Sequence, residues 1–189
     1  MKKLFVAAAL LSVFAATKAQ NVELIPKAGI NISTQSIKGL GNEKARVGIQ
    51  GGLGVNVHTG LTGFSIQPEL NFISKGTSLK TTTGREKLNQ NYLELPVLAK
   101  YSYGLVYVNA GPYIGLRLGE GDKEKLAYGD TKRFDLGVQM GGGLAIPAGP
   151  GKVILDARYS LGLNNIAETS GVNIKNRGIM VSAGYAITL

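Results

Sequence analysis

Eight segments of this chain alternate apolar and polar residues with a period of two. The clearest is 64–72, where every even position from Phe64 to Phe72 is apolar and every odd position is polar. Successive side chains of a strand point to opposite faces, so each segment is predicted to be a strand with one apolar face. The predicted strands span 22–32, 46–57, 64–72, 92–101, 105–118, 134–146, 153–163 and 178–189. With no helix between them, they favour a closed barrel, because closure removes exposed edges.

The connections between these segments alternate in length. Long polar connections are predicted at 33–44, 75–90, 119–132 and 164–176, and short turns at 58–60, 102–104 and 147–151. Outer-membrane barrels combine an even number of antiparallel strands with short periplasmic turns and longer outer loops. We therefore predict an all-β fold, an eight-stranded antiparallel up-and-down transmembrane β-barrel located in the outer membrane.

Alternation alone does not say which face points inward. A soluble, lipocalin-like ligand-binding barrel would have the apolar face inside. Many of the 27 glycines, such as Gly137 and Gly143, lie on the polar face. Glycine weakens a strand and does little for a solvated surface, but it makes room inside a narrow eight-stranded barrel. The glycines therefore favour a polar interior and a lipid-facing apolar surface. Interfacial aromatic residues are predicted at Tyr101, Tyr159 and Tyr185.

Four prolines lie inside predicted strands, at Pro26, Pro68, Pro96 and Pro112. Proline removes a hydrogen bond from the ladder, and a closed barrel has no free edge to accommodate it. Bulges or local kinks are therefore expected at these positions.

The first residues have the pattern of a secretory signal peptide. Lys2 and Lys3 precede an apolar run at 4–16, which is followed by small residues up to Ala19. The run is shorter than the roughly 20 residues that a membrane-spanning helix needs, which disfavours an anchor. We predict cleavage of residues 1–19, leaving the barrel domain at 20–189.

Charged residues recur on the polar face of the predicted strands. Buried charges must be paired and hydrogen-bonded, so these residues are predicted to form a structural ion-pair network in the lumen. An open ion path is disfavoured, because aqueous channels belong to barrels of about twice this strand number. Arg117 and Asp135 are predicted to lie directly opposite each other. The predicted network comprises Arg46, Glu69, Glu94, Lys100, Arg117, Asp135, Asp156 and Arg158, and Glu23 and Lys27 share its face.

The sequence contains no pattern for catalysis. His58 is the single histidine and falls in a short turn, and cysteine is absent. Neither a serine–histidine site nor a His/Cys metal site is therefore indicated, and we predict a non-enzymatic protein without a cofactor or metal.

The net charge of the chain indicates which kinds of partner it could bind. The formal charge is +9, but basic residues are neither clustered nor interleaved with aromatic residues, so nucleic-acid binding is not indicated. The second long connection is basic, which favours either ordinary solubility or contact with lipopolysaccharide phosphates or an acidic partner. Its charged residues are Lys75, Lys80, Arg85, Glu86 and Lys87.

The last predicted strand resembles the C-terminal signal that the barrel-insertion machinery of Gram-negative outer membranes binds. Before closure this strand is an exposed edge, whose main chain can add to another sheet. The positions that match the signal are Ser182, Gly184, Tyr185, Ile187 and Leu189.

Two segments resemble a known family, the PorT-type outer-membrane β-barrel proteins. Segment 64–72, followed by Lys75 and Gly76, is similar to the third strand of that family. Segment 91–101 is similar to its Tyr-Leu-Glu-(Ile/Leu)-Pro strand. The resemblance implies a small barrel of Gram-negative bacteria, and founding members of the family are linked to protein secretion. Two functions stay open: a structural, adhesive or partner-binding role through four long outer loops, or a membrane component of a secretion or envelope-assembly machine.

Overall fold

The computed structural model describes residues 22–37, 45–81, 84–119, 133–165 and 174–189. The predicted signal peptide, residues 1–19, lies outside these ranges. None of the described segments is a helix long and apolar enough to cross a membrane.

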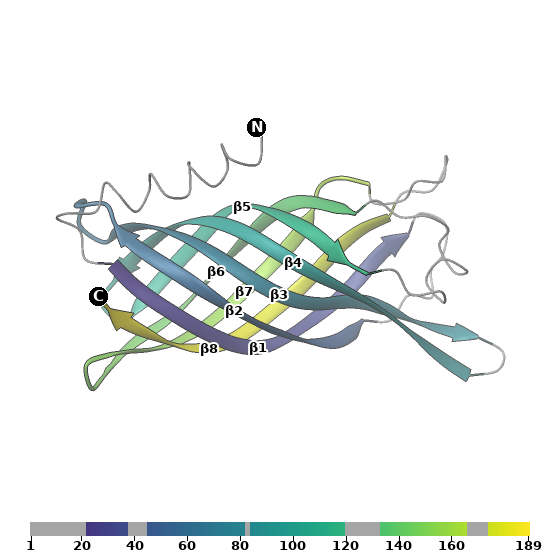
Figure 1. Cartoon of the computed structure of the whole chain (residues 1–189), viewed down its shortest axis with the longest axis horizontal. Coiled ribbons are helices and arrows are strands. Elements are labelled where there is room, and N and C mark those ends of the chain that lie inside the picture. The colour runs from purple at the N-terminus through teal and green to yellow at the C-terminus, as the bar shows by residue number, and fades with distance from the viewer. Residues whose placement is uncertain (1–21, 38–44, 82–83, 120–132, 166–173) are drawn as a thin grey trace.

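Eight antiparallel strands form one closed barrel (Figure 1). Each strand pairs with its neighbours in the sequence, and the last pairs with the first. This confirms the predicted fold class. The strands are β1 (Val22–Ile37), β2 (Arg46–His58), β3 (Phe64–Thr81), β4 (Gly84–Tyr103), β5 (Val106–Leu118), β6 (Phe134–Ala148), β7 (Gly151–Gly162) and β8 (Ile174–Thr188).

The register of the pairs sets the geometry of the barrel. A path of paired residues that leaves β1 at Val22 returns to β1 at Ile32, so one circuit advances the register by ten residues. A staggered register requires the strands to tilt, by roughly 35–45° in barrels of this kind. The full path is Val22, Val57, Ile66, Ala99, Ala110, Met140, Tyr159, Ile179 and Ile32.

The two faces of the strands are sorted as the glycine argument predicts. Large apolar residues such as Ile49, Val108 and Ile179 are exposed on the outside, whereas Glu94 and Asp135 are fully buried inside. A lipocalin-like barrel would have the opposite arrangement, so that alternative is wrong. The outer surface is the face that hydrocarbon can solvate.

The two ends of the barrel differ. Both the start of β1 and the end of β8 lie at the end that carries the short turns (Figure 1). These turns contain Gly60, Gly104 and Gly149, whose φ values of 82°, 59° and 60° favour glycine. We call this end the turn end and the opposite one the loop end. In an outer-membrane barrel the turn end faces the periplasm.

Aromatic side chains gather on the outer face at the turn end. Tyr101 and Tyr103 are exposed there, and Phe64 lies opposite Tyr101. The Tyr185 hydroxyl donates a hydrogen bond to the Ala148 carbonyl at the same end. These residues have the position of an interfacial belt.

The predicted loop at 75–90 is wrong. β3 and β4 continue through it and stay paired with each other up to Thr81 and Gly84. Pairing of β3 with β2 ends at Ile73, and pairing of β4 with β5 begins at Asn91. The hairpin therefore extends past the loop end of the barrel (Figure 1). The sequence of this segment is mostly polar and does not alternate, which is why the period-two pattern did not show it.

Strands also extend further than predicted at two other places. β1 runs to Ile37, into the predicted loop at 33–44, and β8 begins at Ile174, inside the predicted loop at 164–176. These two extensions pair with each other, Ile37 opposite Ile174.

The predicted bulges at the prolines are absent from the described ladders. The register is the same on both sides of Pro26, Pro68, Pro96 and Pro112, so no residue is inserted. Instead the ladder between β1 and β8 skips Ile25 and Pro26, and the other prolines lie beside similar short gaps. Losing a few bonds locally accommodates the missing N–H without shifting the register.

An arginine placed on the lipid face should destabilise the barrel according to its depth. Met140 is near the middle of β6 and exposed outward, so Met140→Arg should cost about 2–4 kcal/mol of unfolding free energy. Leu118 is the last residue of β5 at the loop end, so the matched Leu118→Arg should cost about 0–1 kcal/mol. Urea unfolding in lipid vesicles measures both. Equal costs would contradict the assigned bilayer position.

Candidate functional site

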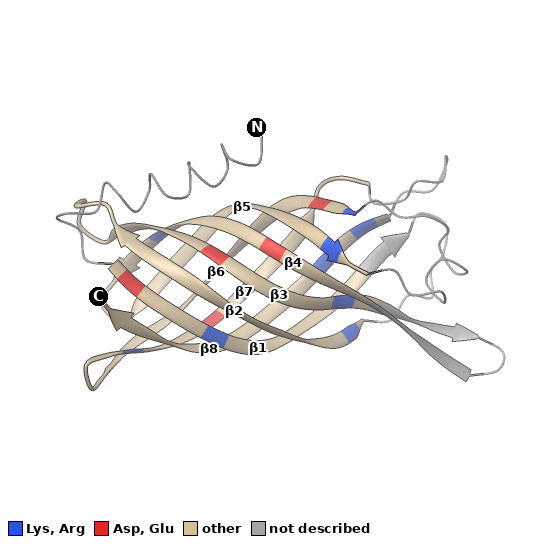
Figure 2. Ribbon diagram, in the orientation of Figure 1, with Lys and Arg blue, Asp and Glu red and all other residues tan. Residues whose placement is uncertain are grey.

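Charged side chains are buried in the interior of the barrel. Figure 2 shows that charged residues occur on the strands from one end of the barrel to the other. They form three groups, named here by their position between the ends. The turn-end layer is Glu23, His58 and Lys152; the middle layer is Lys27, Glu69, Lys100, Asp156 and Arg158; the loop-end layer is Lys75, Glu94, Arg117 and Asp135.

In the middle layer, one arginine joins opposite walls of the barrel. The Arg158 guanidinium on β7 donates two hydrogen bonds to the Glu69 carboxylate on β3, at 2.9 and 3.0 Å. Its Nε also lies 2.6 Å from Asp156 Oδ1. Lys27 Nζ on β1 lies 2.5 Å from the same Glu69 carboxylate. Because β3 and β7 are not neighbours in the sheet, this bidentate pair crosses the lumen.

The two carboxylates of the middle layer accept further hydrogen bonds. Glu69 accepts from the side-chain amides of Gln67, at 2.6 Å, and Asn71, at 2.8 Å. Asp156 accepts from the Tyr107 hydroxyl at 2.7 Å and the Asn109 amide at 3.2 Å. Buried ions are tolerated only when their remaining lone pairs are satisfied in this way.

Lys100, the remaining cation of the middle layer, contacts an amide and an aromatic ring. Its ammonium donates to Gln67 Oε1 at 3.3 Å and lies 4.1 Å from the centroid of the Tyr107 ring. Part of its stabilisation is therefore a cation–π contact, which is stronger away from water. With three cations and two carboxylates, the middle layer is net positive.

The loop-end layer is centred on Lys75, which is 3% exposed. Its ammonium forms ion pairs with Glu94 and, at 3.0 Å, with Asp135. It also lies 5.1 Å from the Tyr92 ring and 4.9 Å from the Tyr113 ring. The prediction that Lys75 lies in a loop is wrong, because Lys75 is paired with Gln90 in the ladder of β3 and β4. Because the residues around Lys75 are polar, the alternation pattern did not show that Lys75 lies on the inward face of β3.

The carboxylates of the loop-end layer are also held by neutral donors. Asp135 accepts from the Tyr113 hydroxyl at 3.2 Å and the Asn176 amide at 2.9 Å, and Glu94 accepts from the Gln139 amide at 2.9 Å. These donors come from β5, β8 and β6, so the layer connects several strands.

The predicted direct pairing of Arg117 with Asp135 is wrong in register. Asp135 lies opposite Gly115, and the Arg117 amide N–H donates to the Arg133 carbonyl. The predicted pairing was centred on the middle of the long connection, and it differs from the observed register by two residues. Arg117 itself is buried, at 7% exposure.

Arg46 lies at the start of β2, partly buried at the loop end. Its guanidinium donates to the Lys75 carbonyl at 2.8 Å and to Ser74 Oγ at 3.5 Å. It therefore fixes the backbone of β3 beside the lysine. The structure places the other seven residues of the predicted network in the buried interior.

The turn-end layer is smaller. The Glu23 carboxylate lies 2.7 Å from Lys152 Nζ and accepts from the Asn56 amide at 2.8 Å. His58, the last residue of β2, lies with Nε2 3.5 Å from Glu23. Lys152 was not predicted because the strand was expected to begin at Val153, whereas β7 begins at Gly151.

Tyrosines and glycines fill the space between the layers. Tyr107 lies opposite Gly143 on β6, and Tyr113 lies opposite Gly137. A Cβ at Gly143 would lie 2.7 Å from the Tyr107 ring, and one at Gly137 would meet the Tyr113 ring at 2.5 Å. Only glycine leaves room for these rings. An apolar cluster of Ile25, Tyr107, Ile154 and Ala186 closes the interior nearer the turn end.

The residues of the predicted insertion signal lie on the second half of β8, except Leu189, which follows its last residue. Ser182 points inward, whereas Ile187 is exposed outward. Gly184 lies opposite Lys27, and the Leu189 amide N–H donates to the Val22 carbonyl at 2.9 Å. In the closed barrel this strand is paired on both sides, so its role as an edge belongs to the stage before closure.

Comparison with known proteins gives one family match. A family model described as an outer membrane protein beta-barrel domain matches residues 17–168. No curated protein sequence is significantly similar to this chain.

Solved structures of small outer-membrane proteins are similar in shape. Neisserial surface protein A (NspA) has a TM-score of 0.48 and 14% identity, covering 88% of this chain and 97% of its own. Ail of Yersinia pestis, solved with the heparin analogue sucrose octasulfate, has a TM-score of 0.47 and 16% identity, covering 89% and 99%. AlkL, solved in lipid bilayers, has a TM-score of 0.48 and 12% identity, covering 88% and 90%. At these levels the likenesses say nothing about function.

Removing the lysine of the loop-end layer should be more harmful than removing the whole set of charges. Lys75→Met leaves Glu94 and Asp135 buried without their cation, which should cost about 3–5 kcal/mol of unfolding free energy. The triple variant Lys75→Met, Glu94→Gln, Asp135→Asn should recover most of that loss. Urea unfolding in lipid vesicles tests both variants. A triple variant no more stable than the single one would show that ion pairing is not what Lys75 contributes.

Deleting residues 187–189 should block assembly. The truncated chain should still cross the inner membrane but accumulate unfolded in the periplasm, because the edge of β8 lacks its last apolar contacts. Fractionation and heat-dependent gel mobility measure this. Leu189→Phe, which keeps a large apolar end, serves as a control and should insert normally. A truncated chain that still folds in the outer membrane would refute the signal.

Proposed function

We propose, because this chain belongs to the family of outer membrane protein beta-barrel domains, that it is a non-enzymatic outer-membrane barrel that binds a partner at its loop end. The barrel itself supplies a scaffold: the ion pairs of the middle layer cross the lumen, and tyrosines fill the space beside the glycines. This interior favours a structural role over the passage of a solute.

The observation that carries the proposal is the projecting hairpin of β3 and β4. Beyond Gly76, residue pairs from Thr77–Leu88 to Thr81–Gly84 extend by roughly 15 Å. Gly76 has a φ of 145°, a conformation that favours glycine, at the point where the hairpin leaves the barrel.

The hairpin offers main-chain hydrogen-bonding groups to a partner. Within the described pairings, Thr77 to Thr81 and Gly84 to Leu88 bond only with each other, so the described part of the chain leaves the outer edge of each strand open. A partner strand can add to such an edge through backbone bonds. An isolated two-stranded hairpin is marginally stable in water, so an added strand would also stabilise it.

The resemblance to PorT-type proteins supports a narrower form of the proposal. Its two motif segments, 64–72 and 91–101, are the barrel-embedded parts of the same two strands that form the hairpin. The partner would then be a component of a secretion or envelope-assembly machine. A structural or adhesive partner outside the cell is the broader form.

A variant with a shortened hairpin tests whether partner binding depends on the hairpin while folding of the barrel does not. Replacing residues 77–88 by Asn-Gly joins Gly76 to Asn89 through a two-residue turn, since these two residues are paired. The variant should fold, as judged by heat-dependent gel mobility, and should lose the partner.

The partner is identified with photo-crosslinking residues placed along 77–81 and 84–88 in living cells. We expect crosslinks to one envelope protein, and we expect them from every second position along one of the two strands. The reason is that a strand presents every second side chain to the same side. A matched variant shortened within 120–132 should keep these crosslinks. Crosslinks that persist without the hairpin, or that arise equally from the control connection, would overturn the proposal.

A further inference from the structure

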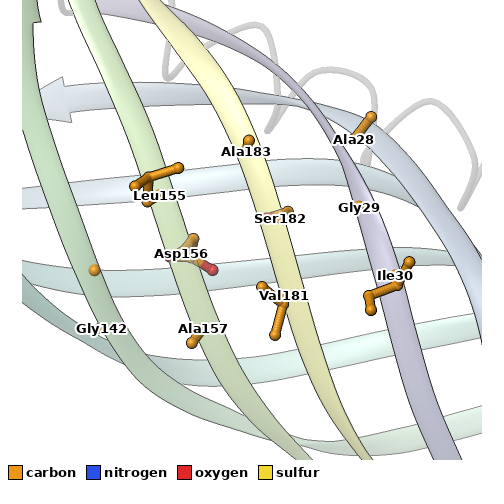
Figure 3. A pocket seen from close by; sticks show the side chains of 11 residues that line it. Ala28, Gly29, Ile30, Gly142, Leu155, Asp156, Ala157, Val181, Ser182 and Ala183 are labelled. Carbon is orange, nitrogen blue, oxygen red and sulfur yellow. The ribbon is translucent and has the colours of Figure 1, made fainter.

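The lipid-facing surface contains an apolar groove of about 440 Å³ across β6, β7, β8 and β1 (Figure 3). Its floor is made of small residues that meet through the strand register: Gly142 lies opposite Ala157, and Ala183 lies opposite Ala28. Larger side chains border it, namely Leu155 and Ile30. The groove lies at the middle of these strands, at the depth of hydrocarbon chains.

Two basic residues lie on the same face of β8 between the groove and the loop end. Arg177 is exposed and Lys175 is half-buried, and both share the outward parity of Ile179 and Val181. Figure 2 shows this basic end of β8. Val181 at the groove lies four positions after Arg177, which is roughly 13 Å along the strand. This distance allows one lipid to place its charged headgroup beside Arg177 and its acyl chain in the groove.

Among the described residues, the strand neighbours of Arg177 supply no counter-charge. Its neighbours across the sheet are Leu161 on β7 and Thr34 on β1. In the described parts of β1, β7 and β8, the residues of outward parity include no aspartate or glutamate. A guanidinium at the level of lipid headgroups, beside an apolar surface, is complementary to a phosphate, which it can bind through two parallel hydrogen bonds.

We propose that this groove, together with Arg177 and Lys175, binds a phosphorylated, multiply acylated glycolipid of the outer leaflet, the lipid A part of lipopolysaccharide. The loop end faces the outer leaflet, so the headgroup phosphate meets the two cations while an acyl chain lies over Ala28, Ala157 and Ala183. This site goes beyond the proposed partner-binding function, because it lies on the barrel wall and does not involve the hairpin.

Retention of lipid A by the full mature barrel tests the proposal. The protein is reconstituted in phosphatidylcholine bilayers containing bis-phosphorylated lipid A, extracted in mild detergent and examined by native mass spectrometry. The barrel is expected to retain lipid A over dephosphorylated lipid A. Arg177→Gln should weaken retention of the phosphorylated form roughly tenfold and leave the dephosphorylated form unchanged.

Filling the groove tests its apolar half. Ala28→Leu with Ala183→Leu keeps the outer face apolar, and should weaken retention of both forms of lipid A. Two matched controls should behave as the natural sequence: Ala110→Leu, on the outer face of β5, and Arg133→Gln, at the loop end of β6. Heat-dependent gel mobility shows that each variant folds.

Three outcomes would overturn the proposal. Retention that is unchanged by Arg177→Gln and by the filled groove would show that this site does not hold the lipid. Phosphatidylglycerol retained as well as lipid A would show only general attraction of anionic headgroups. Dimers that are lost when the groove is filled, with no lipid bound, would make the groove an interface between two copies of this chain.

Discussion

The closed ladder of backbone hydrogen bonds is the constraint on which the rest of this structure depends. In hydrocarbon, unpaired N–H and C=O groups cost several kcal/mol each, so a sheet can span a membrane only by pairing its first strand with its last. Here β1 closes on β8, with the register advanced by ten residues per circuit. Even four strand prolines leave that register unchanged. Closure with eight strands makes the lumen narrow, and the narrow lumen determines what its side chains must do.

Inside that lumen, every charge must find a partner on another strand. Arg158 reaches Glu69 across the barrel, and Lys75 joins Glu94 and Asp135. Such pairs are weak evidence for stability in themselves, since desolvation offsets most of their attraction, but breaking one leaves a buried charge uncompensated. Their consequence is positional: each pair is formed only in one register. The interior ion pairs therefore favour one register of the strands. The surfaces proposed to interact with other molecules are the loop end and the outer wall of the barrel.

The loop end and the outer wall offer different kinds of interaction to a partner. The hairpin of β3 and β4 presents backbone edges in water, where another strand can pair with them. The wall of β6, β7, β8 and β1 presents an apolar groove in lipid, with cations at headgroup level on β8.

The period-two pattern by itself determined the strand number, the antiparallel order and, with the glycines, which face points inward. These follow from local rules, because side-chain direction alternates residue by residue. It also placed Glu69, Glu94 and Arg158 in the interior. It could not find Lys75, which lies in a polar segment without alternation, or Lys152, which lies one residue before the predicted start of its strand. It misplaced Arg117 relative to Asp135, and it mistook the hairpin for a loop. Only the tertiary structure decided these points, because contacts across a barrel depend on the stagger accumulated over all eight strands.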